Sequence, residues 1–161
     1  MLLGVISDTH GCLDTTRSAL KLLQSHHAEY FIHCGDVGGE PVLNLFTGLR
    51  TTFVCGNCDH DPYALQRHAT ILGIHCAGAM GRLTLDDKLI TVLHGDDHRQ
   101  MQRILDEQDC DLLFFGHTHV KTCIDIARIR AINPGAIHRA TTKTVALVNT
   151  ATRDVQFLVV Q

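Results

Sequence analysis

Five short segments of the sequence place aspartate, asparagine or histidine directly after an apolar run and beside or near a glycine. They are Asp8-Thr9-His10, Gly35-Asp36, Gly56-Asn57, His94-Gly95 and Gly116-His117-Thr118-His119. Imidazole nitrogens and carboxylate oxygens both suit divalent transition metals as ligands. Glycines next to them let a metal and its substrate approach the backbone closely. The residue types therefore predict a metal site.

The number of candidate ligands indicates two metal ions rather than one. One four- or five-coordinate ion needs fewer ligands than the segments supply. If one carboxylate bridges two ions, each ion receives four ligands, and ions roughly 3.5–4 Å apart can hold a shared hydroxide and clamp a phosphoryl group. The seven candidates are Asp8, His10, Asp36, Asn57, His94, His117 and His119.

The first third of the chain alternates strand and helix patterns. Strands are expected at Leu2–Ile6, Tyr30–His33 and Thr51–Cys55. Between the first two strands, a helix is expected after a cap at Asp14 or Thr15, with Thr16, Leu20 and Leu23 on one face. Between the second and third, a helix is expected to begin at Pro41, with helical spacing at Val42, Leu45, Phe46 and Leu49. This alternation predicts a parallel sheet with right-handed crossovers, whose carboxyl strand ends meet at one edge where ligands bind.

The rest of the chain is richer in strands. One helix is expected with Met101, Ile104 and Leu105 on one face, and with Asp96 or Asp97 as its N-cap. Strands are expected at Ile71–Cys76, Met80–Leu85, Leu89–Leu93, Leu112–Phe115, Cys123–Ala127, Ile129–Ile132, Thr144–Asn149 and Val155–Val160. The sequence thus predicts one α/β domain over residues 1–161, with two β layers between helices.

Composition favours a small soluble protein. The chain has 161 residues, 45% hydrophobic and 19% charged, with a net charge of −3 and no lysine or arginine run. No nucleic-acid-binding surface, membrane span or signal peptide is expected. The expected location is therefore the cytoplasm. The seven cysteines are odd in number and mostly lie in apolar runs, as free thiols in a reducing compartment would.

The ordered pattern resembles the calcineurin-like metallophosphoesterases, and most closely their small single-domain bacterial and archaeal phosphodiesterases. It reads Asp-x-His, Gly-Asp, Gly-Asn-x-Asp, His-Gly, Gly-His-Thr-His and Asn-Pro-Gly, and runs from Asp8 to Gly135. The resemblance implies a four-layer α/β/β/α sandwich. It also implies a dinuclear phosphodiesterase in which a metal-bridging hydroxide attacks phosphorus in line.

The same resemblance implies a role for each ligand. Asp8, His10 and His119 hold the first ion, Asn57, His94 and His117 hold the second, and Asp36 bridges both. Manganese is favoured for activity, with iron, zinc, cobalt and nickel as alternatives. A small phosphoester is the expected substrate, and either a homodimer or a homotetramer is left open.

The sequence departs from the family pattern at two positions. Many relatives have histidine where Cys58 stands, and a thiol with an ordinary pKa of about 8.5 is a poorer general acid than imidazole at about 6.5. Esters with good leaving groups should therefore be preferred. Asp96 stands where relatives often have a second histidine, and it is a helix cap, an acceptor near the metal or a proton donor.

Other residues near these motifs have simpler interpretations. Asp59 either orients the metal ligands or is a turn residue. The expected catalytic set is Asp36, Asn57, Cys58, Asp59 and His94. His33, His98 and His138 are taken as structural or exposed side chains, and Arg139 as a candidate phosphate contact. The Cys-x-x-Cys formed by Cys55 and Cys58 lacks the second pair that a structural zinc site needs.

Two other functions compete with a phosphodiesterase. A phosphomonoesterase would use the same site. A non-catalytic scaffold protein of the same fold would have a degraded metal site, whereas all seven ligand positions here hold competent side chains.

Overall fold

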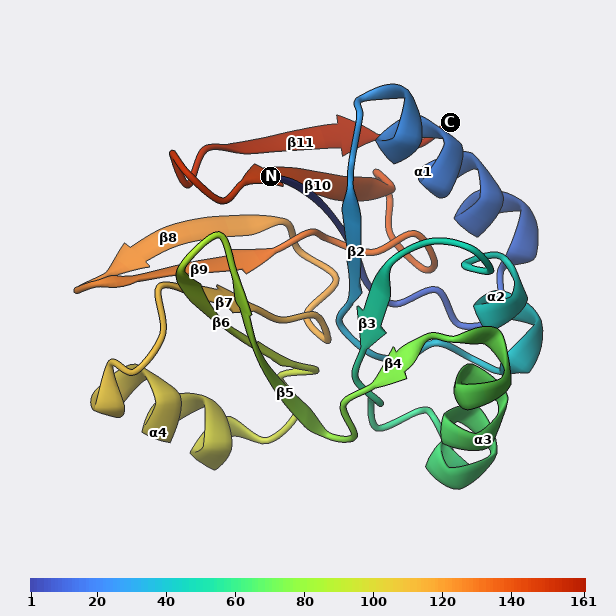
Figure 1. Cartoon of the computed structure of the whole chain (residues 1–161), viewed down its shortest axis with the longest axis horizontal. Helices are drawn as coiled ribbons and strands as arrows, with labels where there is room; N and C mark the ends of the chain where they lie inside the picture. The colour runs from blue at the N-terminus through green and yellow to red at the C-terminus, as the bar shows by residue number, and fades with distance from the viewer.

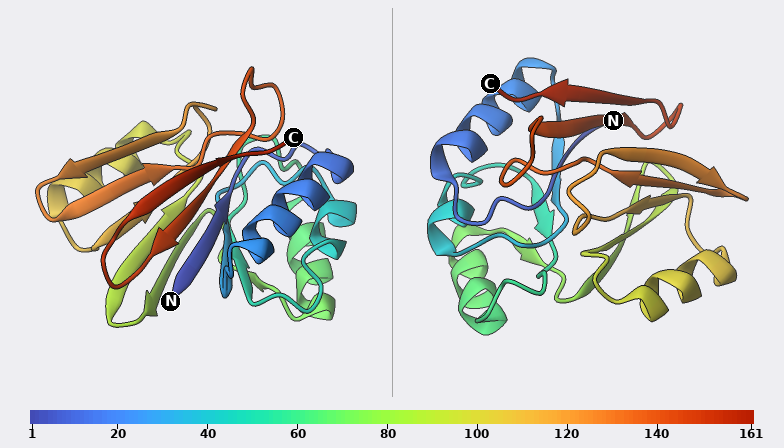
Figure 2. Two further views of the ribbon diagram at one scale, coloured as in Figure 1. Left: turned by 90° about the horizontal axis from the view of Figure 1, so that it is seen from above. Right: turned by 180° about the vertical axis from the view of Figure 1, so that it is seen from behind.

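The computed structural model describes all 161 residues, as two stacked sheets covered by helices on their outer faces. Figure 1 shows α1, α2 and α3 on one side of the molecule and α4 on the other, with the strands between them. The views in Figure 2 show the same layers from above and from behind. The predicted two β layers between helices are confirmed.

The first sheet has six strands in the order β11-β10-β1-β2-β3-β4. Neighbours from β1 to β4 are parallel, while β10 and β11 are antiparallel additions at the other edge. The strands are β1 (Leu2–Ile6), β2 (Tyr30–His33), β3 (Thr51–Phe53), β4 (His75–Cys76), β10 (Thr144–Asn149) and β11 (Val155–Val159).

The second sheet has five strands in the order β5-β6-β7-β9-β8. Its centre, β6, β7 and β9, is parallel, and each edge strand pairs antiparallel with its neighbour. The strands are β5 (Met80–Leu85), β6 (Lys88–Leu93), β7 (Leu112–Phe114), β8 (Thr122–Ile126) and β9 (Ile129–Asn133).

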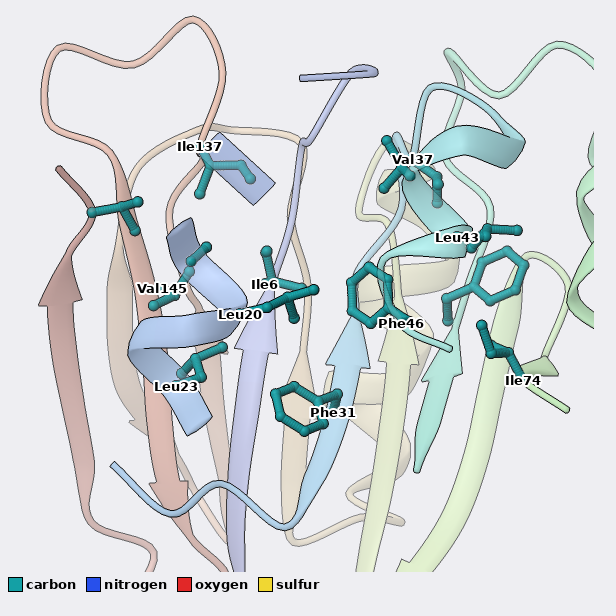
Figure 3. Close-up of a cluster of buried hydrophobic side chains, with 14 of the residues drawn as sticks. Ile6, Leu20, Leu23, Phe31, Val37, Leu43, Phe46, Ile74, Ile137 and Val145 are labelled. Atoms are coloured by element: carbon teal, nitrogen blue, oxygen red, sulfur yellow. The ribbon is translucent and has the colours of Figure 1, made fainter. Parts of the chain in front are cut away.

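Side chains that alternate along the strands divide the core into three layers. In β1, Leu3 and Val5 face the second sheet, whereas Ile6 packs with the helices. The layer between the first sheet and its helices contains Phe31, Leu23 and other apolar side chains drawn in Figure 3. Because strands buried on both faces need apolar residues at every position, these segments are continuous apolar runs.

The four helices are α1 (Leu13–Ser25), α2 (Glu40–Asn44), α3 (Pro62–Leu72) and α4 (His98–Glu107). None of them is long and apolar enough to cross a membrane. In α1 the buried face contains Thr16, Leu20 and Leu23, as predicted. Its predicted cap was wrong, since the helix already begins at Leu13 and the preceding Cys12 makes no capping hydrogen bond through its side chain.

The largest error concerns α3, which the sequence interpretation missed. The strand predicted at Ile71–Cys76 is wrong over most of its length, because α3 continues to Leu72 and β4 is only two residues long. The signals were present: Asp61 accepts a hydrogen bond from the Ala64 amide at 2.8 Å, Pro62 follows, and Gly73 ends the helix. Ile71, predicted as the first residue of that strand, lies in α3 and is 81% exposed.

The second helix is shorter than predicted. α2 ends at Asn44, and the chain continues through hydrogen-bonded turns as far as Leu49. Val42 and Phe46 are nevertheless buried, so the helical spacing identified the inward face correctly.

Candidate metal centre

The loops after β1, β2, β6 and β7 bring five of the seven candidate ligands into mutual contact. The Nε2 atom of His10 lies 3.9 Å from Asp8 Oδ1 and 3.6 Å from Asp36 Oδ2. His94 Nε2 lies 3.3 Å from Asp36 Oδ2, and His119 Nε2 lies 3.2 Å from Asp8 Oδ1. Segments more than a hundred residues apart in sequence thus meet where strands of both sheets end.

The loops after β1, β2 and β7 hold ligands in left-handed backbone conformation, whereas in the loop after β6 only Gly95, next to His94, does so. The φ angles are +55° at Asp8, +43° at His10, +54° at Asp36, +65° at His117 and +60° at His119. Non-glycine residues rarely adopt this region, and such strain collects where side chains must be aimed at a functional site. The tight turns direct these side chains inward.

Several buried polar atoms in the cluster have no hydrogen-bond partner. They are Asp8 Oδ1, His10 Nε2 and His94 Nε2. The side chains of Asp8 and Asp36 are 0% and 4% exposed, and neither forms an ion pair with lysine or arginine. Buried carboxylates without a cationic partner are costly, and bound metal cations would compensate both the charge and the unpaired atoms. The donor set fits divalent metal ions.

Asp36 lies at the centre of the cluster. Its Oδ1 accepts a hydrogen bond from the Cys58 amide at 2.8 Å, so its Oδ2 is left facing His10 and His94. Burial disfavours the charged carboxylate, but the interactions with His94 and the Cys58 amide outweigh it and hold the pKa of Asp36 below its ordinary value. The carboxylate is therefore ionised and placed between two groups of histidines.

The imidazole of His94 is fixed in one tautomer. Its Nδ1 lies 2.8 Å from the Cys34 carbonyl oxygen, which can only accept, so Nδ1 carries the hydrogen and Nε2 can offer a lone pair to a metal. Burial opposes a charge on this ring, yet the nearby Asp36 carboxylate and the Cys34 carbonyl raise the pKa of His94. A Cβ at Gly35 would lie 2.6 Å from Nδ1, so glycine is required there.

The two histidines of the Gly-His-Thr-His segment face different neighbours. The His117 ring centroid lies 5.2 Å from that of His94, and the His119 ring centroid lies 5.6 Å from that of His10. The His117 amide also donates to Asp8 Oδ2 at 3.2 Å. The two rings therefore lie beside different candidate ligands.

Asn133, at the end of β9, holds this loop in place. Its side-chain amide donates to the Gly116 carbonyl at 2.7 Å and lies 3.1 Å from Thr118 Oγ1. Its own oxygen accepts from the Gly135 amide at 2.9 Å. The sequence interpretation treated Asn-Pro-Gly only as a turn and a motif, so this positioning role was missed, although the motif was the available signal.

Asn57 and Cys58 lie at the exposed end of the cluster. The Cys58 thiol is near His10 and Asp36, in a group whose ligand atoms lie within 4.8 Å of one another. The neighbouring Asp36 carboxylate raises the pKa of this thiol, so it is protonated at neutral pH. Asn57 is exposed, and its side-chain amide donates one hydrogen bond, to the Cys58 sulfur at 3.6 Å. The Asn57 side chain thus forms no hydrogen bond with the other candidate ligands.

Asp59 connects the loops that carry Asp36 and Asn57. Its Oδ2 accepts from the amides of Val37 at 3.1 Å and Gly56 at 2.9 Å, and its Oδ1 accepts from the Gly38 amide at 2.9 Å. The side chain is buried. Of the two interpretations left open by the sequence, this geometry matches an orienting residue rather than a simple turn residue.

The cap of α4 is Asp97 and not Asp96. Asp97 Oδ1 accepts from the amides of Arg99 and Gln100, both at 3.0 Å. Asp96 is exposed and lines a hollow next to Asn57. The cap interpretation of Asp96 was therefore wrong, and His98 is simply an exposed first residue of α4.

His33 is buried behind the cluster with a defined tautomer. Thr9 Oγ1 donates to the Val37 carbonyl at 2.8 Å, so His33 Nε2 donates to Thr9 at 2.9 Å, and His33 Nδ1 accepts from the Gly35 amide at 3.2 Å. Burial, with the nearby His94 charge, lowers the pKa of His33 to about 3. A neutral ring thus ties the loops of Asp8 and Asp36 together.

The sequence and the structure were compared with those of known proteins. A profile of the calcineurin-like phosphoesterase superfamily domain matches residues 1–153. A phosphodiesterase of Methanocaldococcus jannaschii is 24% identical over 138 residues, which cover 84% of this chain and 83% of that protein. A probable metallophosphoesterase of the same organism is 31% identical over 145 residues, covering 84% of this chain and 68% of that protein.

A solved structure of a novel archaeal phosphodiesterase superposes with a TM-score of 0.93. It is 22% identical and covers 99% of this chain, which in turn covers all of that chain. At this identity the likeness concerns the fold alone, and it confirms the four-layer α/β/β/α architecture expected from the sequence.

Proposed function

The chain belongs to the calcineurin-like phosphoesterase superfamily, and from this membership we propose that it hydrolyses phosphodiesters with two divalent metal ions. One observation carries the proposal: the carboxylates of Asp8 and Asp36 are buried without a lysine or arginine partner. In the same cluster, Asp8 Oδ1, His10 Nε2 and His94 Nε2 have no hydrogen-bond partner.

The residues would divide between the ions in the following way. Asp36 would serve both ions, because its Oδ2 faces His10 on one side and His94 on the other. When bound, the ions supply a water of lowered pKa and neutralise charge that develops on the phosphoryl oxygens. The first would be held by Asp8, His10 and His119, and the second by Asn57, His94 and His117.

The other residues would support this centre from the protein side. The carbonyl of Cys34 keeps His94 in the tautomer that offers Nε2, and Asp59 keeps the loops of Asp36 and Asn57 together. The protonated Cys58 thiol, exposed beside Asp36, stands at the sequence position where many relatives have histidine. A weak acid there favours diesters with good leaving groups.

The name of one relative favours a diester over a monoester substrate. The Methanocaldococcus jannaschii protein is called a phosphodiesterase. The scaffold alternative requires a degraded metal site, whereas here each of the seven ligand positions holds a residue able to bind a metal.

The test compares bis(4-nitrophenyl) phosphate with 4-nitrophenyl phosphate at equal concentration, with manganese added to metal-stripped protein. We expect faster hydrolysis of the diester, its loss with a chelator, and recovery when manganese is restored. Iron, zinc, cobalt and nickel are compared in parallel, and the metal content of the purified protein is measured for a stoichiometry of two.

Substitutions identify the site. Asp36→Ala and His94→Ala should abolish turnover, while His98→Ala, which removes an exposed histidine at the start of α4, should not. Full turnover in Asp36→Ala would refute the assignment of the site, and faster hydrolysis of the monoester would refute the diester preference.

A further inference from the structure

Two hollows of opposite character flank the metal-ligand cluster. One, of about 550 Å³, is lined by Asn57 and contains the Asp59, Asp96 and Asp97 side chains in its wall. The other, of about 380 Å³, is lined by His119 together with Lys121 and Arg139. Because a candidate ligand forms part of each wall, a substrate bound at the cluster can extend into either hollow.

The hollow beside Asn57 suits an uncharged group. None of its lining residues is lysine or arginine, and Asp96 and Asp97 are exposed in its wall. Gln66, Gln100 and the 73% exposed Tyr63 supply neutral hydrogen-bonding and ring surfaces. A second phosphate placed here would meet carboxylates and no cation.

The hollow beside His119 suits an anion. None of its lining residues is acidic. Lys121 and Arg139 form no ion pair, in contrast to Arg17, Arg82, Arg128 and Arg130, each of which pairs with an aspartate. Lys121 instead lies with its Nζ 5.6 Å from the centre of the Phe157 ring.

Two hydroxyls complete this cationic hollow. They belong to Thr141 and Thr142, which are exposed in the wall of the hollow. The third threonine of the wall, Thr144, already donates its hydroxyl hydrogen to the Pro134 carbonyl at 2.8 Å. Arg139 follows His138, whose ring lies 5.4 Å from that of His10. The guanidinium therefore belongs to a segment that reaches the metal ligands directly.

We propose that the cationic hollow binds a second phosphate of the substrate, so that the enzyme acts on phosphodiesters that carry a phosphomonoester on one substituent. Guanidinium and ammonium groups with adjacent hydroxyls are the side chains that recognise phosphate. The other substituent, uncharged, would occupy the hollow beside Asn57. This inference rests on the phosphodiesterase function proposed above.

The kinetic test uses two chromogenic diesters that differ only in the second phosphate. They are the 4-nitrophenyl ester of thymidine 5′-phosphate and the same compound phosphorylated at the 3′-hydroxyl. With manganese-loaded protein, kcat/KM should be about tenfold higher for the 3′-phosphorylated ester, mainly through KM, as expected for one or two charge-assisted hydrogen bonds.

Matched variants separate the hollow from the overall charge. Lys121→Ala and Arg139→Ala should each bring the ratio of the two kcat/KM values toward one. Lys21→Ala on α1 and Arg103→Ala on α4, which remove exposed side chains of the same kinds away from the site, should leave the ratio unchanged. A ratio near one in the unmodified protein, or a high ratio that survives both hollow substitutions, would overturn the inference.

A binding measurement does not depend on catalysis. Inorganic phosphate added to metal-free protein should shift the amide resonances of Thr141 and Thr142, and the shifts should disappear in Lys121→Ala,Arg139→Ala. Absence of these shifts would also overturn the inference. If bis(4-nitrophenyl) phosphate is hydrolysed but the thymidine esters are not, the substrate class is wrong and the phosphodiesterase function stands; if no diester is hydrolysed, that function itself fails.

Discussion

Removal of the Asp59 carboxylate should weaken both the fold and metal binding, because three backbone amides lose their acceptor at once. Val37 is fully buried, so its amide would remain unsatisfied. Gly38 is exposed and Gly56 is partly exposed, so water can partly replace the carboxylate there. A buried donor left without a partner costs about 1–3 kcal/mol, and less where water can enter.

From these exposures we expect Asp59→Ala to lower the free energy of unfolding by about 3–4 kcal/mol. Asp59→Asn keeps one acceptor oxygen but presents an amide group to a neighbouring N–H, so its cost should be about half as large. Metal affinity should fall by about 10–100-fold, as is usual when a group that orients ligands is removed.

Urea denaturation of metal-free protein gives the stability change, and competition with a chromogenic chelator gives the metal dissociation constant. Asp61→Ala is the matched control, since Asp61 caps α3 through the Ala64 amide and contacts no metal ligand; it should cost about 1 kcal/mol and leave metal affinity unchanged. If Asp59→Ala costs no more than Asp61→Ala and binds metal normally, Asp59 is a turn residue after all.

Three further predictions follow from the same geometry. In Gly56→Ala the new Cβ would overlap the Asp36 carboxylate, so metal affinity measured by competition should fall at least about tenfold, whereas Gly48→Ala, with open space around it, should not change it. The pKa of His33 falls from 6.5 to about 3 on folding, so its contribution to stability is full above pH 6.5 and is lost as pH falls toward 3. Metal-free protein should therefore lose up to about 1.4 kcal/mol per pH unit in urea denaturation over this range, and His33→Gln should show a smaller loss; an equal loss would contradict the role of His33. Cys58→His should raise turnover of alkyl diesters more than that of aryl diesters in steady-state assays, because alkyl leaving groups depend more on a proton donor. An equal increase for both would show that the weak acidity of Cys58 does not limit proton donation to the leaving group.

Local patterns in the sequence were sufficient for most of the fold. The bounds of Leu2–Ile6, Tyr30–His33 and Thr144–Asn149 were predicted as the structure has them, because strands buried on both faces are unbroken apolar runs. The helix α3 was missed because only Leu65 and Ala69 are buried on it, and so its apolar periodicity is weak. Its end at Ile71 and Leu72 looked like the start of a strand.

The candidate ligands were also accessible from the sequence, because each follows a strand and lies beside or near a glycine. Their division was inferred from resemblance, and the structure supplies distances for only part of it. His119 contacts Asp8 and His94 contacts Asp36, but the Asn57 side chain hydrogen-bonds only to the Cys58 sulfur.

The sequence by itself determined which residue types stand at the strand ends, and these residue types predict a metal site. Only the tertiary structure decided which loops touch. Asp59, Asn133 and His33 each hydrogen-bond across loops far apart in sequence, and no local pattern records such partners. The same holds for the two hollows, whose walls differ in charge because separate segments of the chain line them.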